Sequence, residues 1–465
     1  MSSSPPSLTV SRPRLLQIGL PLFFEMCAGT AVGMVGVAMA ARLSDTAGAG
    51  LSVGNHLFGL LFMVFRLIGA GVSVVVAQNL GAQNRAEADR VAKAGLAAST
   101  WMGGAMGLLA FFQANALLRL LNVPPDVLSL ATPLLQALAP VLVLDAWNAC
   151  MASVMRAHFK SRETLWVTLL MHLTHLALVW PLMHGWGTVP GWGLPGFALA
   201  LGVSRVLGGT LLMWGWRSAL GLRPIAADWW RLRWAQLAPV LHIGVPGAAE
   251  NLSWEIAFMV SVAAVGLMGA TALATQAYVL QFNMWILISA AAVGLTIEMV
   301  VGHLVGARQY KNAYWLVQKA QKLALGLSLL ISVLMAWQGQ RLLGVFTQDP
   351  SILSAGGELL WWSVALETGR TFNLIVIAAL RATGDARFPL WVGLCSMTVV
   401  MAGGSWFLGL HLGWGLTGVW IAYAADEWLR GLVMWHRWLS LGWLRKAQAV
   451  HLRTGQQRVA LKGSH

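Results

Sequence analysis

Two apolar segments of this sequence each place a glutamate four residues after a proline. Residues 18–25 read IGLPLFFE and residues 243–250 read IGVPGAAE, so Glu25 and Glu250 occur in the same local pattern. A proline inside a helix frees a backbone carbonyl, and the residue four positions on shares its helix face. A carboxylate beside a free carbonyl could bind a proton or a small cation. The alternative is a carboxylate that is only neutralised by a hydrogen bond between helices.

The composition places these carboxylates inside a membrane. Of the 465 residues, 57% are hydrophobic and only 10% are charged, whereas a soluble domain carries about 25% charged residues. A carboxylate within a membrane span costs about 2.5–3.5 kcal/mol on insertion scales, so it is a functional candidate by default. Counted along their helices, Glu25 and Glu250 are expected near the middle of the bilayer.

The hydrophobic pattern predicts an all-α integral membrane protein with twelve transmembrane helices. Their expected ranges are 15–40, 51–80, 93–121, 131–157, 164–184, 192–216, 239–268, 276–305, 316–338, 352–380, 388–410 and 415–439. This gives a tail at 1–14, an N-terminal six-helix lobe at 15–216, a linker at 217–238, a C-terminal six-helix lobe at 239–440 and a basic tail at 441–465. Because the linker contains DWWRLRW, we expect it to form a helix at the membrane interface.

An internal repeat relates the two halves. At a constant offset of 225 residues, segment 18–167 maps onto 243–392 without a net gap, and Asn148 and Arg156 match Asn373 and Arg381. Further on, GWGLPG at 191 matches GWGLTG at 413 at an offset of 222. Each half holds six predicted helices, so both copies enter the membrane from the same side. This is a parallel repeat, and binding sites in such proteins lie between the repeats.

Other charged residues in the predicted helices are further candidates for binding ions. Glu367 and Arg370 lie three residues apart and can pair on one helix face, either as part of a functional network or as a structural ion pair. Asp145 occupies the repeat position of Arg370, so the two halves carry opposite charges there. Glu255 lies five residues after Glu250 and faces a different neighbour.

Enzymatic and metal-dependent functions find no support in the motifs. The sequence contains no Walker A, GxSxG or HExxH pattern, which argues against an enzyme and against a nucleotide-driven pump. Cys27, Cys150 and Cys395 lack metal-ligand spacing and are interpreted as core residues. We therefore expect no cofactor and no metal, and any uphill transport must use an ion gradient.

The motifs resemble those of the multidrug and toxic compound extrusion (MATE) transporters. The resemblance is carried by the two six-helix halves, by VAQNLGAQNRAEA and its echo VGHLVGARQYKNA, and by ALRATGDARFP. It covers about residues 15–440 and implies two lobes that export amphipathic, often cationic, small molecules against inward proton or sodium flow. The alternatives are a lipid-linked saccharide flippase of the same superfamily and an exporter of one specific metabolite.

One departure from the family pattern shifts the expected coupling site. Many relatives carry an aspartate in the first helix, where this sequence has Gly36. The resemblance therefore favours the C-terminal lobe, with Glu250, Glu367 and Arg370 as coupling residues and Glu25 second. The residues expected to line the substrate cavity are Glu298, Asn251 and Asn373.

The distribution of basic residues predicts how the chain sits in a bacterial inner membrane. Loops on the side of the two termini carry 24 Lys and Arg residues, against 3 on the other side. By the positive-inside rule both termini are cytoplasmic, and the formal charge of +14 needs no nucleic-acid partner. In a variant without native cysteines, a cysteine placed in 217–238 or at His465 should resist membrane-impermeant maleimide in intact cells. Labelling of intact cells would show that the orientation is inverted.

Overall fold

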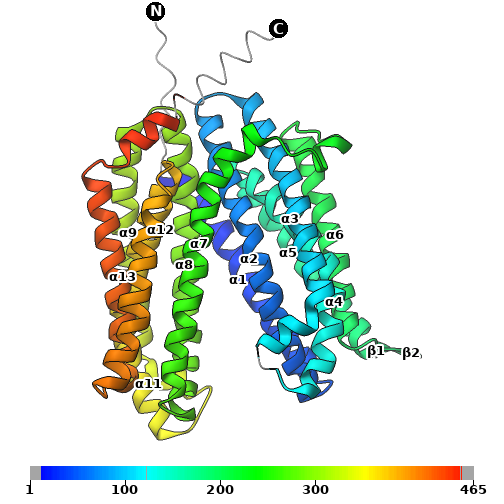
Figure 1. Cartoon of the computed structure of the whole chain (residues 1–465), viewed down its shortest axis with the longest axis vertical. Coiled ribbons are helices and arrows are strands. Elements are labelled where there is room, and N and C mark those ends of the chain that lie inside the picture. Colours follow the sequence, from blue (N-terminus) through cyan, green and yellow to red (C-terminus); the bar gives the residue numbers. More distant parts are fainter. Residues whose placement is uncertain (1–11, 122, 451, 453–465) are drawn as a thin grey trace, which may run out of the picture. The chain divides into compact units, whose positions relative to one another are not determined.

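The computed structural model describes residues 12–121, 123–450 and 452 and consists almost entirely of helices (Figure 1). The elements are α1 (Arg12–Ala41), α2 (Asp45–Gly81), α3 (Arg85–Leu120), α4 (Pro125–Ala157), α5 (Ser161–His184), β1 (Gly185–Trp186), β2 (Val189–Pro190), α6 (Leu194–Ala219), η1 (Ala226–Trp229), α7 (Trp234–Gly266), α8 (Ala270–Gly306), α9 (Tyr310–Trp337), α10 (Gly339–Leu343), α11 (Pro350–Ala382), α12 (Arg387–Ser396), η2 (Met397–Gly403), η3 (Ser405–His411) and α13 (Gly415–Leu439). The π-helical segments η2 and η3 continue α12, so the part of the chain that the structure describes forms the twelve long helices that the sequence predicts.

Eleven helices within the described residues are long and apolar enough to cross a membrane. The long helix that is not among these eleven is α13, which carries Asp426, Glu427 and Arg430 within its 25 residues. Its charges are buried against other helices, with Asp426 0% exposed. A long helix with a buried polar face is therefore the twelfth element of the predicted fold.

The chain divides into two compact units. The boundary falls within α7, between Gly244 and Val245. The unit before it holds α1 to α6 except for Gly81 at the end of α2, and the unit after it holds residues 81–83, the rest of α7 and the helices that follow. We call them the N-lobe and the C-lobe.

The internal repeat is visible in the helix bounds. α2 and α8 begin and end 225 residues apart, and α4 and α11 do the same. The left-handed turns that follow these helices repeat as well. Gln83 and Arg308 have φ of 56° and 60°, and Phe159 and Gly384 have φ of 60° and 88°. The predicted duplication therefore extends to the local geometry of the turns.

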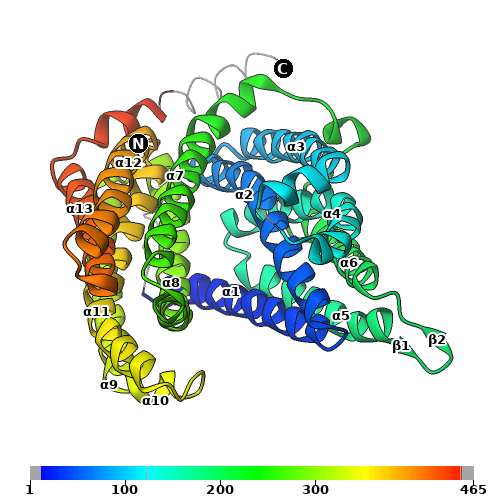
Figure 2. The same ribbon diagram turned by 60° about the horizontal axis from the view of Figure 1, so that its bottom comes forward.

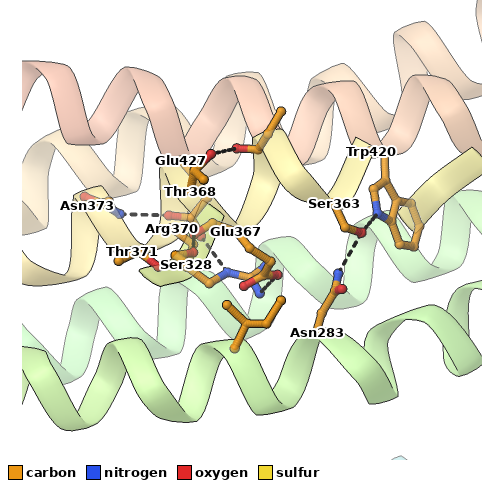
Figure 3. Close-up of polar contacts among 12 residues, drawn as sticks. Asn283, Ser328, Ser363, Glu367, Thr368, Arg370, Thr371, Asn373, Trp420 and Glu427 are labelled. Carbon is orange, nitrogen blue, oxygen red and sulfur yellow. Dashed lines mark hydrogen bonds and ion pairs between the residues drawn. The ribbon is translucent and has the colours of Figure 1, made fainter. Parts of the chain in front are cut away.

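One helix is central to each lobe. In the N-lobe, α4 packs against α3, α5 and α6, while α1 packs along α5 (Figure 2). In the C-lobe, α11 packs against α8, α9 and α13. Ser363 of α11 ties these neighbours together, because its hydroxyl accepts hydrogen bonds from Asn283 of α8 at 3.0 Å and from Trp420 of α13 at 2.9 Å (Figure 3). Polar side chains on α4 and α11 are thus enclosed by neighbouring helices.

The predicted interfacial helix in the linker does not form. Only the four-residue turn η1 is helical before α7 begins at Trp234. The Asp228 carboxylate accepts from the Ile225 N–H at 3.1 Å and pairs with Lys93 and Arg233 at 3.0 and 2.9 Å. These contacts hold a tight turn against α3, and such side-chain hydrogen bonds compete with a regular helix.

The basic tail expected from residue 441 begins as a packed segment. Residues 444–450 are helical, and Trp443 is 0% exposed with its ring stacked 4.5 Å from that of Trp438. Before it, Arg437 of α13 donates to Asp385 at 2.8 Å. The folded C-lobe therefore extends past the predicted end of its last helix.

The GWGLxG motif of each half ends in a glycine that has no room for a side chain. A Cβ on Gly196 would lie 2.2 Å from the Leu182 carbonyl oxygen, and one on Gly418 would lie 2.7 Å from the Leu408 carbonyl carbon. In both lobes the glycine lets the last long helix begin directly against the end of the preceding one. This close approach explains why the motif occurs in both halves.

We expect Gly196→Ala and Gly418→Ala to destabilise their lobes by about 1–3 kcal/mol, because the added methyl group must displace backbone. Gly104→Ala is the matched control, since nothing lies within 4 Å of its Cβ position. Thermal unfolding of the purified protein, followed by size-exclusion chromatography, measures the effect. An unchanged melting temperature for both glycine variants would contradict the packing described.

Candidate functional site

A buried cluster of charged residues lies between α11 and α13 in the C-lobe (Figure 3). Arg370 donates to Glu367 at 2.7 Å and to Glu427 at 3.3 Å, so one guanidinium bridges two carboxylates. Glu367 is 0% exposed and Glu427 is 4% exposed. The predicted pairing of Glu367 with Arg370 on one face of this helix is confirmed. Glu427 on the facing helix is an additional member.

The cluster continues along α13. Arg430 pairs with both carboxylates of the preceding turn, at 2.9 Å to Glu427 and 2.7 Å to Asp426. Asn373 donates to Glu427 at 2.9 Å, and Ser396 donates to Asp426 at 2.6 Å. Hydrogen bonds from neutral side chains thus supplement the arginines. The serine is the last residue of α12, where the chain passes into the π-helical segment η2.

The charges of the five ionisable side chains in this cluster do not cancel. Glu367, Asp426 and Glu427 face only two arginines, and the Glu367 Oε2 atom is buried without a hydrogen-bond partner among the described residues. An unpaired buried charge is costly, whereas a protonated or cation-bound carboxylate avoids that cost. This arrangement can therefore bind and release one positive charge.

The N-lobe has a related ion pair of opposite polarity. Asp145 of α4 pairs with Arg205 of α6 at 2.5 Å, and Asn148 donates to the Arg205 carbonyl at 3.0 Å. Asp145 is the repeat position of Arg370, and at the offset of 222 Arg205 is the position of Glu427. The acid and the base have exchanged places between the lobes. In the N-lobe the two charges cancel.

Each lobe also contains an ion pair made by the glutamate that follows a proline. Glu25 of α1 pairs with Arg156 at 2.9 Å, and Glu250 of α7 pairs with Arg381 at 2.7 Å. Both arginines are the penultimate residues of their helices, α4 and α11. Each glutamate therefore pairs with the end of the central helix of its lobe. The depth near the middle of the bilayer stays a prediction.

The remaining predicted residues lie in varied surroundings. Asn373 is 0% exposed and belongs to the cluster, and Glu298 is 6% exposed on α8, so both are enclosed by helices of the C-lobe. Asn251 is exposed on α7, and Glu255 is half-buried one turn further on.

The sequence analysis missed several partners of these acids. It assigned no role to Arg156 and Arg381, although both glutamate–arginine pairs share a separation of 131 residues. That equality at repeat-related positions was a usable signal. It also overlooked Arg205 as the repeat counterpart of Glu427, which the offset of 222 reveals.

The reversed polarity of the Asp145–Arg205 pair leads to a prediction about the stability of the N-lobe. Asp145→Arg places a second buried cation beside Arg205 and should cost about 3–5 kcal/mol, as expected when a buried pair is broken. The double variant Asp145→Arg/Arg205→Glu reproduces the polarity of the C-lobe and should recover most of that loss. Thermal unfolding of the three proteins tests this. A double variant no more stable than Asp145→Arg would show that the two sites are not interchangeable in charge.

Comparisons with known proteins agree with the repeat and the two lobes. The MatE family model matches residues 21–180 and 246–406, once in each lobe. The uncharacterised transporter YisQ of Bacillus subtilis is 30% identical over 94% of this chain and 96% of its own length. The probable multidrug resistance protein NorM of Bradyrhizobium diazoefficiens is 27% identical over 88% of this chain and 89% of its own.

A solved structure shares the fold. The crystal structure of MATE in the bent conformation superimposes with a TM-score of 0.85 at 17% identity, covering 95% of this chain and 96% of its own. Together with the twofold family match, the helix repeat and the buried charges, this identifies the chain as a member of the MatE family of integral membrane transporters.

Proposed function

We propose that this protein is a secondary-active exporter of amphipathic, mostly cationic small molecules, driven by inward flow of protons or sodium ions. The observation that carries the proposal is the imbalance of buried charge in the C-lobe. The buried acids of the described part of the C-lobe are Glu250, Glu298, Glu367, Asp385, Asp426 and Glu427, and the arginines near them are Arg370, Arg381, Arg430 and Arg437. The corresponding N-lobe pairs hold two acids and two arginines.

The excess of two acids supports binding of cations within the C-lobe. A carboxylate buried without a partner favours uptake of a proton or a metal cation, and release of that cation restores the charge. A membrane potential supplies about 2.3 kcal/mol per charge per 100 mV to drive such a cycle. A negative lobe interior also favours cations over the pyrophosphate of a lipid-linked saccharide. The relatives named for multidrug resistance support the same substrate class.

The Glu250–Arg381 pair and the cluster around Glu367 interact electrostatically within the C-lobe. Arg381 and Arg430 both lie within electrostatic range of Glu250. Arg430 in turn pairs with Glu427, which shares Arg370 with Glu367. A charge that binds near Glu250 therefore changes the field along a chain of alternating acids and arginines. We infer that Glu250, Glu367 and Arg370 carry coupling, as expected from the sequence.

Reconstituted transport tests the assignment of the lobe. In proteoliposomes with an imposed proton or sodium gradient, Glu250→Gln should abolish gradient-driven ethidium transport while ethidium binding remains. Glu25→Gln is the matched control at the repeat position and should reduce transport less, because its pair is balanced and more exposed. Unchanged coupling in Glu250→Gln, or a larger loss in Glu25→Gln, would assign coupling to the N-lobe instead.

A further inference from the structure

Glu298 is a buried acid that the ion pairs described so far do not explain. It lies in the second half of α8 and is 6% exposed. Its Oε1 atom is buried without a hydrogen-bond partner among the described residues. An ionised carboxylate in such a place is costly, and a proton on the carboxyl group removes most of that cost. A purely structural acid would be expected to have a complete set of partners.

The packing of α8 on α11 places Glu298 beside Arg381. A Cβ on Gly294 would lie 3.6 Å from the Leu374 carbonyl oxygen and 3.8 Å from the Ala378 Cβ, so the helices are in close contact there. The two helices run in the same direction, because α9 returns the chain between them. About one turn beyond this contact, Glu298 on α8 and Arg381 on α11 therefore lie at the same height along the two helices. They are within electrostatic range of each other.

Arg381 is thus shared between two acids. One of its terminal nitrogens donates to Glu250 at 2.7 Å, while its Nε is buried without a partner among the described residues. Backbone encloses the pair closely. A Cβ on Gly247 would lie 3.4 Å from Arg381 Cζ, and one on Gly393 would lie 3.3 Å from Glu250 Cγ. The guanidinium therefore has a free donor and little room on the sides of α7 and α12.

The N-lobe lacks the third member of this group. Ser73 occupies the repeat position of Glu298, and Leu22 and Thr168 occupy those of Gly247 and Gly393. The side chains of Glu25 and Arg156 are 18% and 20% exposed, against 5% for Glu250 and 18% for Arg381. The two glycines and the additional acid therefore distinguish the C-lobe site, in which the glutamate is the more buried partner, from its counterpart.

We propose that Glu298 is a proton-binding residue that competes with Glu250 for Arg381, and so passes protons to and from the cluster around Glu367. This rests on the proposed function and specifies its coupling ion as the proton. In the arrangement seen, Glu298 carries the proton and Arg381 binds Glu250. When the Glu298 O–H bond breaks and an O–H bond forms on Glu250, the guanidinium is drawn to the new Glu298 anion. The three groups keep the same net charge throughout the exchange.

The charged surroundings favour the proton on Glu298 rather than on Glu250, because a nearby cation stabilises an ionised carboxylate. Among the described residues, Arg381 is the charged group within electrostatic range of Glu298, and α9, which packs on α8, adds none. Glu250 has a second cation within range, Arg430 of α13. A proton on Glu250 frees Arg430 to interact more strongly with Glu427 and Asp426, which links this exchange to the inner cluster.

The test compares Glu298→Gln with Ser73→Ala, the matched change in the N-lobe. In proteoliposomes with ethidium as the probe, pH-gradient-driven transport should fall about a hundredfold in Glu298→Gln, the scale expected for loss of a proton-transfer group. Ethidium exchange at equal pH on both sides, which needs no net proton movement, should stay close to wild type. Ser73→Ala should retain both activities.

Two outcomes overturn different claims. If wild type is driven by the pH gradient and Glu298→Gln is driven equally well, the role of Glu298 is refuted while the proposed function stands. If the wild-type protein transports ethidium without any response to ion gradients, the proposed function fails and this proposal fails with it.

A second measurement does not depend on the glutamine variant folding. Infrared difference spectra of the wild-type protein on alkalinisation should show loss of a protonated carboxyl band. That band should shift in Glu298→Asp and stay in place in Ser73→Ala. An identical band in wild type and Glu298→Asp would assign the proton to another group and overturn the proposal.

Discussion

The constraint on which this structure depends is the cost of burying a carboxylate among packed helices. Each lobe meets it with arginines on its central helix or on a neighbouring one. α4 supplies Arg156 to Glu25, and α11 supplies Arg381 to Glu250. These pairs hold the first helix of each half against the end of the fourth. Because a broken buried pair costs several kcal/mol, the charges restrict which helix arrangements are stable.

Duplication followed by divergence accounts for the difference between the lobes. The shared features are the glutamate–arginine pair, the asparagine on the central helix and a second ion pair whose polarity is reversed. The C-lobe then adds acids at positions where the N-lobe has uncharged residues. Glu298, Glu367 and Asp426 replace Ser73, Leu142 and Ser204. In the proposed mechanism, extra acids with too few arginines allow this motif to exchange cations.

Much of the fold could be predicted from the sequence, because hydrophobic length and the repeat depend on local pattern. The pairing of Glu367 with Arg370 was also predictable, since three residues separate neighbours on a helix face. The partners of Glu25 and Glu250 were not, because they depend on how helix ends are staggered in space. The prediction of an interfacial helix in the linker was wrong for a different reason. Its tryptophans and arginines suggested an interfacial helix, but the contacts of Asp228 hold a turn instead.

The central claim is that the coupling cation binds among the acids of the C-lobe. It is tested most directly by measuring the dissociation constant of ethidium from the purified protein against pH and sodium concentration. If substrate and cation compete through the C-lobe, the wild-type constant rises with proton or sodium concentration, and so does that of the Asp145→Asn/Arg205→Gln protein. Glu367→Gln should make the constant independent of both. A constant that still responds in Glu367→Gln, but no longer responds in the N-lobe variant, would contradict the account.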